Sequence, residues 1–158
     1  MKFNKSKGFT IIEVLVAMII LSIGVLGLGV LQLTSLQNTQ SGQMKSQASI
    51  MAYDIIDSMR TNIPSVNSGS YGITLATDTP DAVNCYGGQA DCTAAQMAIS
   101  DVNHWRTTLG VSLPSGNGGI ATTDLGDTTL VSVTISWIDP YSAADGNEQI
   151  VLTSEMPR

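Results

Sequence analysis

A single carboxylate stands near the start of an apolar segment that is long enough to cross a membrane. Across residues 8–44 the only charged side chain is Glu13, and residues 14–31 are apolar or glycine except for Ser22. With the apolar residues ahead of Glu13, this run spans about 30 Å of hydrocarbon as a helix. A charge at the bilayer centre costs about 2.5–3.5 kcal/mol on insertion scales, so an intramembrane carboxylate indicates a function.

A basic leader precedes this segment. Lys2, Lys5 and Lys7 lie within the first seven residues. They favour a cytoplasmic N-terminus by the positive-inside rule, so the remainder of the chain is expected across the membrane. An ordinary secretory signal has a shorter apolar stretch and an Ala-x-Ala-like cut after it, and neither is present here.

The remainder of the chain is acidic. The whole chain of 158 residues predicts one domain, and its net charge is −6. Without the leader, four Lys and Arg face thirteen Asp and Glu, and twelve of these acids lie beyond Asn38. Nucleic acids and anionic membranes are bound mainly by basic side chains, so the charge argues against both as partners.

The two cysteines predict one disulfide. Cys85 and Cys92 are separated by six residues, unlike the C-x-x-C of redox and zinc sites. An even cysteine number in an exported chain favours a structural disulfide. Closing this small loop contributes about 2–3 kcal/mol in the chain-entropy description.

An apolar stripe extends the helical pattern beyond the membrane segment. It predicts a helix from about Phe9 to Arg60, ended by Asn62 and Pro64, and on the order of 75 Å long. The first half is expected in lipid or a filament core, and the second half against a globular domain. The stripe consists of Met44, Ala48, Met51, Ile55 and Met59.

Four glycines within this predicted helix allow two interpretations. They permit close helix–helix contact in membranes, or they mark a segment that loosens when the subunit leaves the bilayer. The sequence favours close contact and leaves the second interpretation open. The glycines are Gly24, Gly27, Gly29 and Gly42.

Shorter elements follow Pro64. Alternation of apolar and polar residues predicts a strand over residues 131–137. Turn residues on both sides favour a strand over 71–77, and the turn at 145–147 favours a partner strand over 149–153. A second helix is expected between Cys92 and Gly110, with Thr93 or Asp91 as N-cap, and residues 115–119 are expected to form a loop. The predicted fold class is α+β: one very long N-terminal helix, half transmembrane, packed on a small antiparallel β-sheet.

The N-terminal residues resemble the type IV prepilin signature. The resemblance lies in the basic leader, the run Gly8-Phe9-Thr10, Glu13 and the long apolar helix. It implies a type IV pilin-like fold, cleavage between Gly8 and Phe9 by prepilin peptidase, and N-methylation of Phe9. It also implies that Glu13 guides assembly, because pairing with the new amine offsets the cost of its burial.

Later segments resemble the PilV family of minor type IV pilins. The similarity covers residues 33–62 and the order of features beyond Cys85, including His104-Trp105-Arg106 and Val133-Thr-Ile-Ser-Trp137. It implies a minor pilin that primes assembly at the pilus tip. The implied partners are other minor pilins (FimU-, PilW-, PilX- and PilE-like), the major pilin and a PilY-type tip adhesin.

The same resemblance divides the chain into three parts. Residues 1–8 are the cleaved leader, 9–36 the transmembrane and assembly half of the helix, and 37–158 a periplasmic α+β headgroup. The expected location is a single-pass inner-membrane protein with a periplasmic C-terminal domain, later at the pilus tip.

Catalytic and metal chemistry are poorly represented. His104 is the only histidine, so His-based triads and metal clusters lack partners, and we expect neither an enzyme nor a cofactor. Calcium is a minor hypothesis, because acidic residues gather near a turn without the EF-hand spacing. These residues are Asp124, Asp127, Asp139, Asp145, Asn147 and Glu148.

Two other functions compete with the pilus-priming interpretation. A minor pseudopilin of type II secretion has the same leader, glutamate and long helix. A binding or adhesion module at the pilus tip is the other, and the acidic composition argues against DNA as its ligand.

Overall fold

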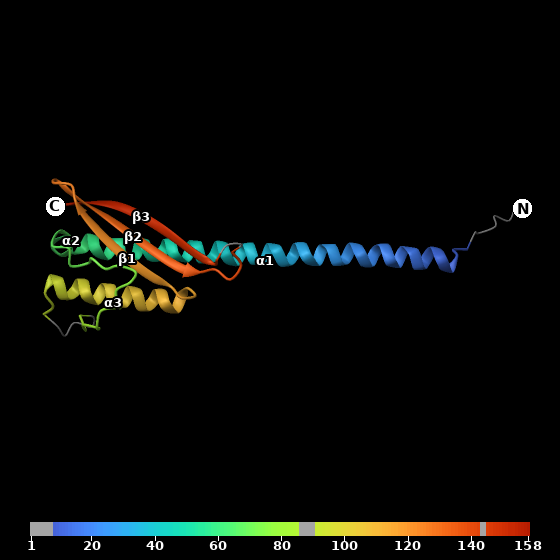
Figure 1. Cartoon of the computed structure of the whole chain (residues 1–158), viewed down its shortest axis with the longest axis horizontal. Helices are drawn as coiled ribbons and strands as arrows, with labels where there is room; N and C mark the ends of the chain where they lie inside the picture. Colours follow the sequence, from blue (N-terminus) through green and yellow to red (C-terminus); the bar gives the residue numbers. More distant parts are fainter. Residues whose placement is uncertain (1–7, 86–90, 143–144) are drawn as a thin grey trace, which may run out of the picture. The chain divides into compact units, whose positions relative to one another are not determined.

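A computed structural model describes residues 8–85, 91–142 and 145–158 of the protein. These residues form helices and a three-stranded sheet. The chain divides into two compact units, Met1–Gln40 and Ser41–Arg158, and helix α1 contributes to both. The elements in order are α1 (Ile11–Thr61), α2 (Ile63–Asn67), α3 (Ala94–Ser112), β1 (Asn117–Asp124), β2 (Thr128–Ile138) and β3 (Asn147–Pro157) (Figure 1).

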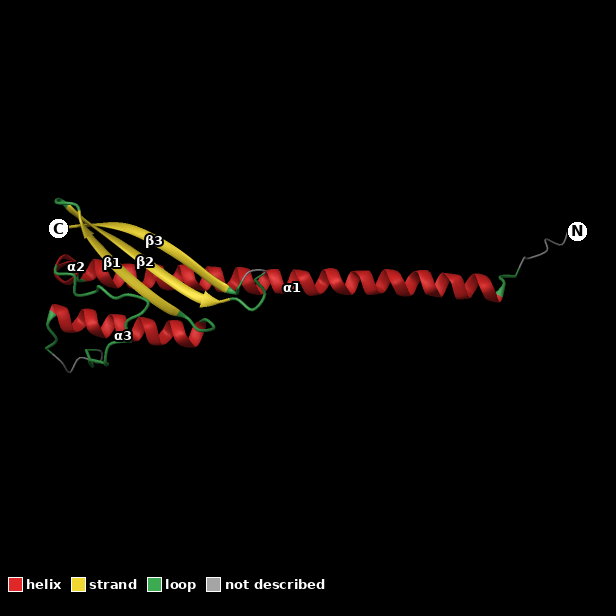
Figure 2. Ribbon diagram, in the orientation of Figure 1, coloured by secondary structure: helices red, strands yellow, loops and turns green. Residues whose placement is uncertain are grey.

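The sheet is antiparallel, with the strand order β1-β2-β3 (Figure 2). Residues of β2 alternate between buried and half-buried positions, as a strand with one covered face requires. Ile120, Val133 and Leu152 form one cross-strand row on the covered face. The predicted strand over residues 131–137 is confirmed, and the strand predicted over 149–153 extends to both sides.

Both long helices attach to the sheet within the second unit. Lys45 Nζ lies 3.4 Å from Glu148 Oε2, which joins α1 to β3. Arg106 Nε donates to the carbonyl of Gly118 at 2.8 Å, which joins α3 to β1. Trp105 Nε1 donates to the carbonyl of Met51 at 2.9 Å and so connects the two helices.

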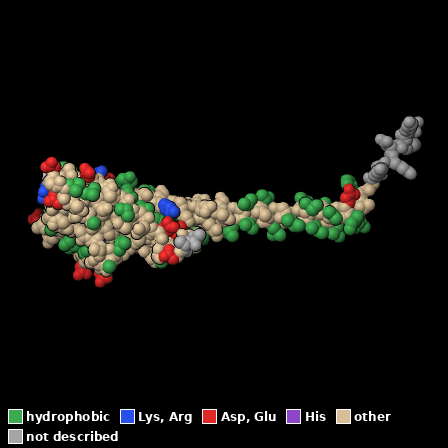
Figure 3. All heavy atoms as spheres, turned by 45° about the horizontal axis from the view of Figure 1, so that its top comes forward, with side chains coloured by type: hydrophobic (Ala, Val, Ile, Leu, Met, Phe, Trp, Pro, Cys, Tyr) green, Lys and Arg blue, Asp and Glu red, His purple; other side chains and the backbone are tan. Residues whose placement is uncertain are grey.

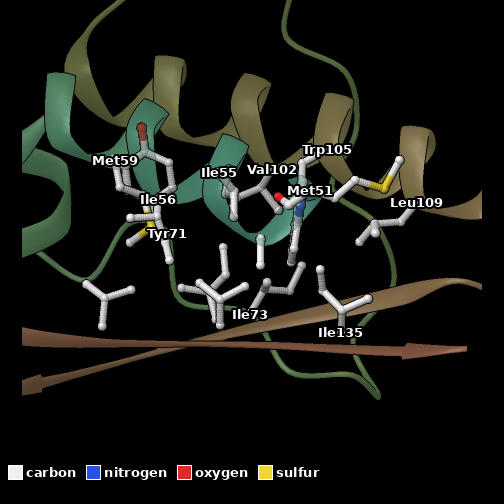
Figure 4. Packing of buried hydrophobic residues seen from close by; sticks show 14 of the residues in the cluster. Met51, Ile55, Ile56, Met59, Tyr71, Ile73, Val102, Trp105, Leu109 and Ile135 are labelled. Carbon is white, nitrogen blue, oxygen red and sulfur yellow. The ribbon is translucent and has the colours of Figure 1, made fainter. Parts of the chain in front are cut away.

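The core lies between these helices and the sheet. Figure 4 shows side chains of α1 and α3 directed toward the strands. Four members of the predicted stripe are buried: Ala48, Met51, Ile55 and Met59. Ala52 and Ile56 are buried as well. The buried face of α1 is therefore wider than the stripe, because the helix packs against both α3 and the sheet.

The first strand corrects one prediction. Residues 117–119, expected in a loop, belong to β1 and pair with β2. Two glycines stand here because neighbours approach closely: a Cβ on Gly118 would overlap the Trp105 ring and lie 2.8 Å from Leu109 Cδ1. A Cβ on Gly119 would lie 3.3 Å from the carbonyl oxygen of Ile73. The glycines thus serve packing against α3 and against the 73–75 segment.

The strand predicted over residues 71–77 is wrong except for one bridge. Ile73 exchanges two backbone hydrogen bonds with Ile120, of 3.0 and 2.7 Å. The carbonyls of Thr74 and Thr77 instead accept from Arg106, and that of Leu75 accepts from a side chain of β1. Side-chain donors therefore occupy the acceptors that a ladder would need.

Two helix boundaries also differ from expectation. The helix α3 continues past Gly110 to Ser112, because Leu113 is buried and its N–H donates to the Leu109 carbonyl. The short helix α2 was not predicted and begins directly after Asn62. The α+β class, with a long N-terminal helix on a small antiparallel sheet, is confirmed.

Candidate functional site

The first turn of α1 carries the candidate assembly site. The Thr10 hydroxyl and carbonyl both accept from the backbone N–H of Glu13, at 3.4 and 3.1 Å. Thr10 thus satisfies one of the amides that a helix start leaves without a partner. Glu13 lies in that first turn, where the helix dipole favours negative charge. The Thr-x-x-Glu spacing is a sequence signal for this cap, and the sequence analysis missed it.

Phe9 and Glu13 lie beside the same hollow. A shallow groove of about 430 Å³ along α1 is lined by both residues. The remaining lining residues are apolar: Val14, Ala17, Met18 and Leu21. The geometry of the first unit therefore places the predicted new N-terminal residue and the predicted assembly carboxylate on one side of the helix.

The surroundings of this site are apolar and uncovered. The segment of α1 beyond Glu13 is long and apolar enough to cross a membrane, and none of the membrane-length window is buried within the chain. Figure 3 shows apolar side chains along this helix. Phe9 itself is 83% exposed. Such a surface requires lipid or other helices around it.

The predicted cleavage point lies just ahead of the helix. Gly8 and Phe9 precede Ile11, the first residue of α1, and have no regular secondary structure. Both residues are exposed, so a peptidase could reach the bond between them. Lys2, Lys5 and Lys7 lie outside the described residues.

Cys85 and Cys92 form the disulfide that the sequence predicts. It joins the segment before α3 to the residue ahead of the α3 N-cap. That N-cap is Thr93, one of the two predicted candidates, and its side chain accepts from the Gln96 backbone while Gln96 bonds back. The disulfide therefore lies next to a helix N-terminus that is closed by the two reciprocal hydrogen bonds of a capping box.

Polar groups at the centre of the second unit were not singled out from the sequence. Asn62 donates to Tyr71 Oη (3.3 Å) and to the Ala94 carbonyl (2.8 Å). Tyr71 Oη donates to the Asp101 carboxylate at 2.6 Å. These residues connect the end of α1, the segment after α2 and the start of α3. Their role is structural, since buried polar groups need such partners.

The structural role of Arg106 was not indicated by the sequence. Its guanidinium is buried and donates to the carbonyls of Gly118, Thr74 and Thr77. Burial lowers the pKa of Arg106, and the carboxylate of Asp78 acts in the opposite direction. Carbonyl partners leave no pattern in a sequence, so only the apolar neighbours in α3 could have indicated that this charge lies inside.

The residues considered for catalysis and calcium are dispersed. His104 is exposed on α3. Asp139 Oδ1 accepts from the Tyr141 N–H, and Asp145 accepts from Asn147, whose hydrogen bonds lower the pKa of Asp145. These are contacts of turns. Within residues 8–85, 91–142 and 145–158, no three His, Cys, Asp or Glu side chains gather closely enough to hold a metal ion.

Comparison with known families gives two adjoining matches. Residues 3–29 match the profile described as the prokaryotic N-terminal methylation motif. Residues 30–103 match the profile of type IV pilin Tt1218. Neither the comparison with curated proteins nor that with solved structures finds a match.

The fold, the N-terminal site and these matches define a class. The chain is a type IV pilin-like protein with a prepilin methylation motif. The more particular similarity is to type IV pilin Tt1218, and it covers α1 from residue 30 onward, α2 and about the first half of α3. Processing by prepilin peptidase and assembly with other pilins follow from this class, which is structural and not enzymatic.

Proposed function

We propose that this chain is a minor pilin that helps prime type IV pilus assembly and sits in the tip complex. The observation that carries the proposal is Glu13, the only charge across residues 8–44, beside Phe9 at the start of an uncovered apolar helix. The PilV-like features of the later chain support the minor role. The partners would be FimU-, PilW-, PilX- and PilE-like pilins, the major pilin and a PilY-type adhesin.

Processing prepares the site. Prepilin peptidase would cut between Gly8 and Phe9, remove residues 1–8 and methylate the Phe9 amine. A carboxylate left alone in an apolar bundle is penalised, and pairing with a neighbour's N-terminal amine offsets this cost. Because each subunit has one such carboxylate at one height, the pair fixes the axial register of an incoming subunit.

The location follows from the same division of the chain. Residues 9–36 would hold the subunit in the inner membrane, and residues 37–158 would form its periplasmic headgroup. Assembly would then transfer the apolar segment from lipid into the filament core. A minor pseudopilin of type II secretion would use the same N-terminal site, but the match to a type IV pilin profile over residues 30–103 favours the pilus.

The test is replacement of Glu13 in cells that assemble the pilus. We expect Glu13→Ala to be cleaved and membrane-bound but to fall about tenfold or more in sheared filaments, since breaking a buried ion pair costs several kcal/mol. Immunoblots of filament and membrane fractions, with the mass of the processed chain, measure this. Thr34→Ala, on the same helix, is the control.

Two outcomes would contradict the proposal. Incorporation of Glu13→Ala at the wild-type level would remove the assembly role of the carboxylate. Crosslinking from Lys45 that captures secretion pseudopilins, and no pilins, would place the chain in the secretion machinery.

A further inference from the structure

The strand β3 forms one edge of the sheet, and no described strand lies on its outer side. It pairs with β2 residue by residue from Asn147 to Pro157, so its inner side is fully used and has no bulge. Figure 2 shows β3 as the outermost strand. In an edge strand every second residue directs its N–H and C=O away from the sheet, which leaves a row of donors and acceptors without strand partners.

The opposite edge of the sheet is covered. Ile73 exchanges two backbone hydrogen bonds with Ile120 of β1, and Asn117 Nδ2 donates to the Leu75 carbonyl at 2.8 Å. The segment 73–75 thus occupies the outer side of β1. Within residues 8–85, 91–142 and 145–158, no segment pairs in this way with the outer side of β3.

The middle of β3 lacks the features that usually protect an exposed edge, which are charged side chains, proline and bulges. Residues 149–154 contain no charge, no proline and no glycine, and Val151 at their centre is 54% exposed. Charges stand only at the two ends. Glu148 is paired with Lys45, whereas Glu155 is exposed and has no ion pair in the part of the chain that the structure describes. The strand is therefore open to another strand, with one unpaired acid near its end.

We propose that the outer side of β3 binds an extended segment of a neighbouring protein subunit, as an added strand that places Lys or Arg opposite Glu155. The inference rests on the proposed function, which supplies the neighbour. In such pairing the backbone hydrogen bonds give affinity, and alternate side chains give specificity. Val151 and Glu155 lie four residues apart in β3 and share one face of the sheet. The partner segment would therefore carry an apolar and a basic side chain at the same spacing.

Charge selects such a segment over a second copy of this chain. Without the leader, four Lys and Arg face thirteen Asp and Glu, and like net charge opposes association. These four cations are already engaged. Lys45, Arg60 and Arg158 each form an ion pair, and Arg106 is buried against carbonyls. A second copy thus offers no unengaged cation to Glu155.

The test uses the full chain in detergent micelles with the synthetic peptide Lys-Thr-Val-Thr-Val-Thr-Lys, which has the required spacing in both strand directions. We expect saturable protection of alternate β3 amides against hydrogen exchange, and no change in β1. The same peptide N-methylated at every residue has no N–H to donate and should give no protection.

Two variants locate the binding. Val151→Lys should weaken it about tenfold, because lysine at an edge opposes the addition of a strand. Leu125→Lys is the matched control, since Leu125 is also 54% exposed but lies in the turn between β1 and β2. It should leave the binding unchanged. Wild-type hydrogen exchange in β1 shows that each variant is folded.

Three results would overturn the proposal: no protection of β3, equal protection by the N-methylated peptide, or equal losses in Val151→Lys and Leu125→Lys. Protection that rises with protein concentration in the absence of peptide would identify a second copy as the occupant and overturn the assignment of a basic partner. In cells, Val151→Lys should fall in sheared filaments relative to Leu125→Lys. If Val151→Lys enters filaments at the wild-type level while Glu13→Ala does not, the edge assignment fails and the proposed function stands.

Discussion

Two residues of the second unit show how closely single positions are constrained. Gly118 of β1 lies against the ring of Trp105 of α3. Arg106, also in α3, donates hydrogen bonds to three backbone carbonyls outside that helix. Both contacts join α3 to β1, and neither has the apolar character by which core residues are usually recognised. A substitution at either position is therefore expected to destabilise the protein, although the pattern of hydrophobic residues does not indicate this.

Gly118→Ala should destabilise the protein by about 1–3 kcal/mol, because its methyl group would overlap Trp105 in a packed core. Denaturant unfolding in micelles, followed by tryptophan fluorescence, measures the change. Gly110→Ala is the matched control: its nearest neighbour would be 3.9 Å away, and alanine favours the helix. An equal loss in both variants would contradict the close approach.

Arg106→Lys should cost about 1–3 kcal/mol although the charge is kept, because one ammonium cannot serve three separated carbonyls. Hydrogen exchange of residues 73–77 should accelerate with it. Arg158→Lys, which changes an exposed ion pair with Asp124, is the comparison and should have little effect. Unchanged exchange at residues 73–77 would show that Arg106 does not hold this segment.

At the scale of elements, the periodicity of apolar residues predicted α1 and β2 correctly. The stripe on α1 and the alternation in β2 were visible because burial repeats with the period of the backbone. The strand β1 was not predicted because Gly118 and Gly119 read as loop residues. Glycine is needed at these positions because Trp105 and Ile73, which are distant in the sequence, pack closely against them. The segment 71–77 had strand composition, but Arg106 takes its carbonyls, and a local pattern carries no such information.

The disulfide acts at the scale of elements, since it attaches the start of α3 to the segment before it. Cys85→Ser with Cys92→Ser should lower the free energy of unfolding by about 2–3 kcal/mol. Thermal unfolding with and without reductant provides the measurement. The wild type in reductant should match the double serine variant; a reductant effect on the variant itself would assign the loss to another cause.

At the scale of the whole molecule, the two units differ in what the sequence reveals. Glu13 and Phe9 were recognisable because a charge in an apolar run stands out, and the structure adds their common groove and the Thr10 cap. The polar interior of the second unit was not recognisable. Its partners are carbonyls and a tyrosine hydroxyl, brought together only by the fold.

The two edges of the sheet are fastened by different forces, and ionic strength should separate them. The β3 edge is attached to α1 by two solvent-accessible polar contacts, the Lys45–Glu148 ion pair and the Arg60–Ser154 hydrogen bond. The β1 strand is attached to α3 through buried Arg106. At 1 M salt the Debye length is about 3 Å, so exposed charges are screened while buried contacts are much less affected. Hydrogen exchange should therefore rise in β3 between 0.1 and 1 M NaCl and stay constant in β1, and equal changes would contradict this.

In this protein the salt-sensitive edge of the sheet is therefore β3. The core and the β1 edge would be equally stable in dilute and in saline solution. Salt would change only how often the last strand, β3, separates from α1.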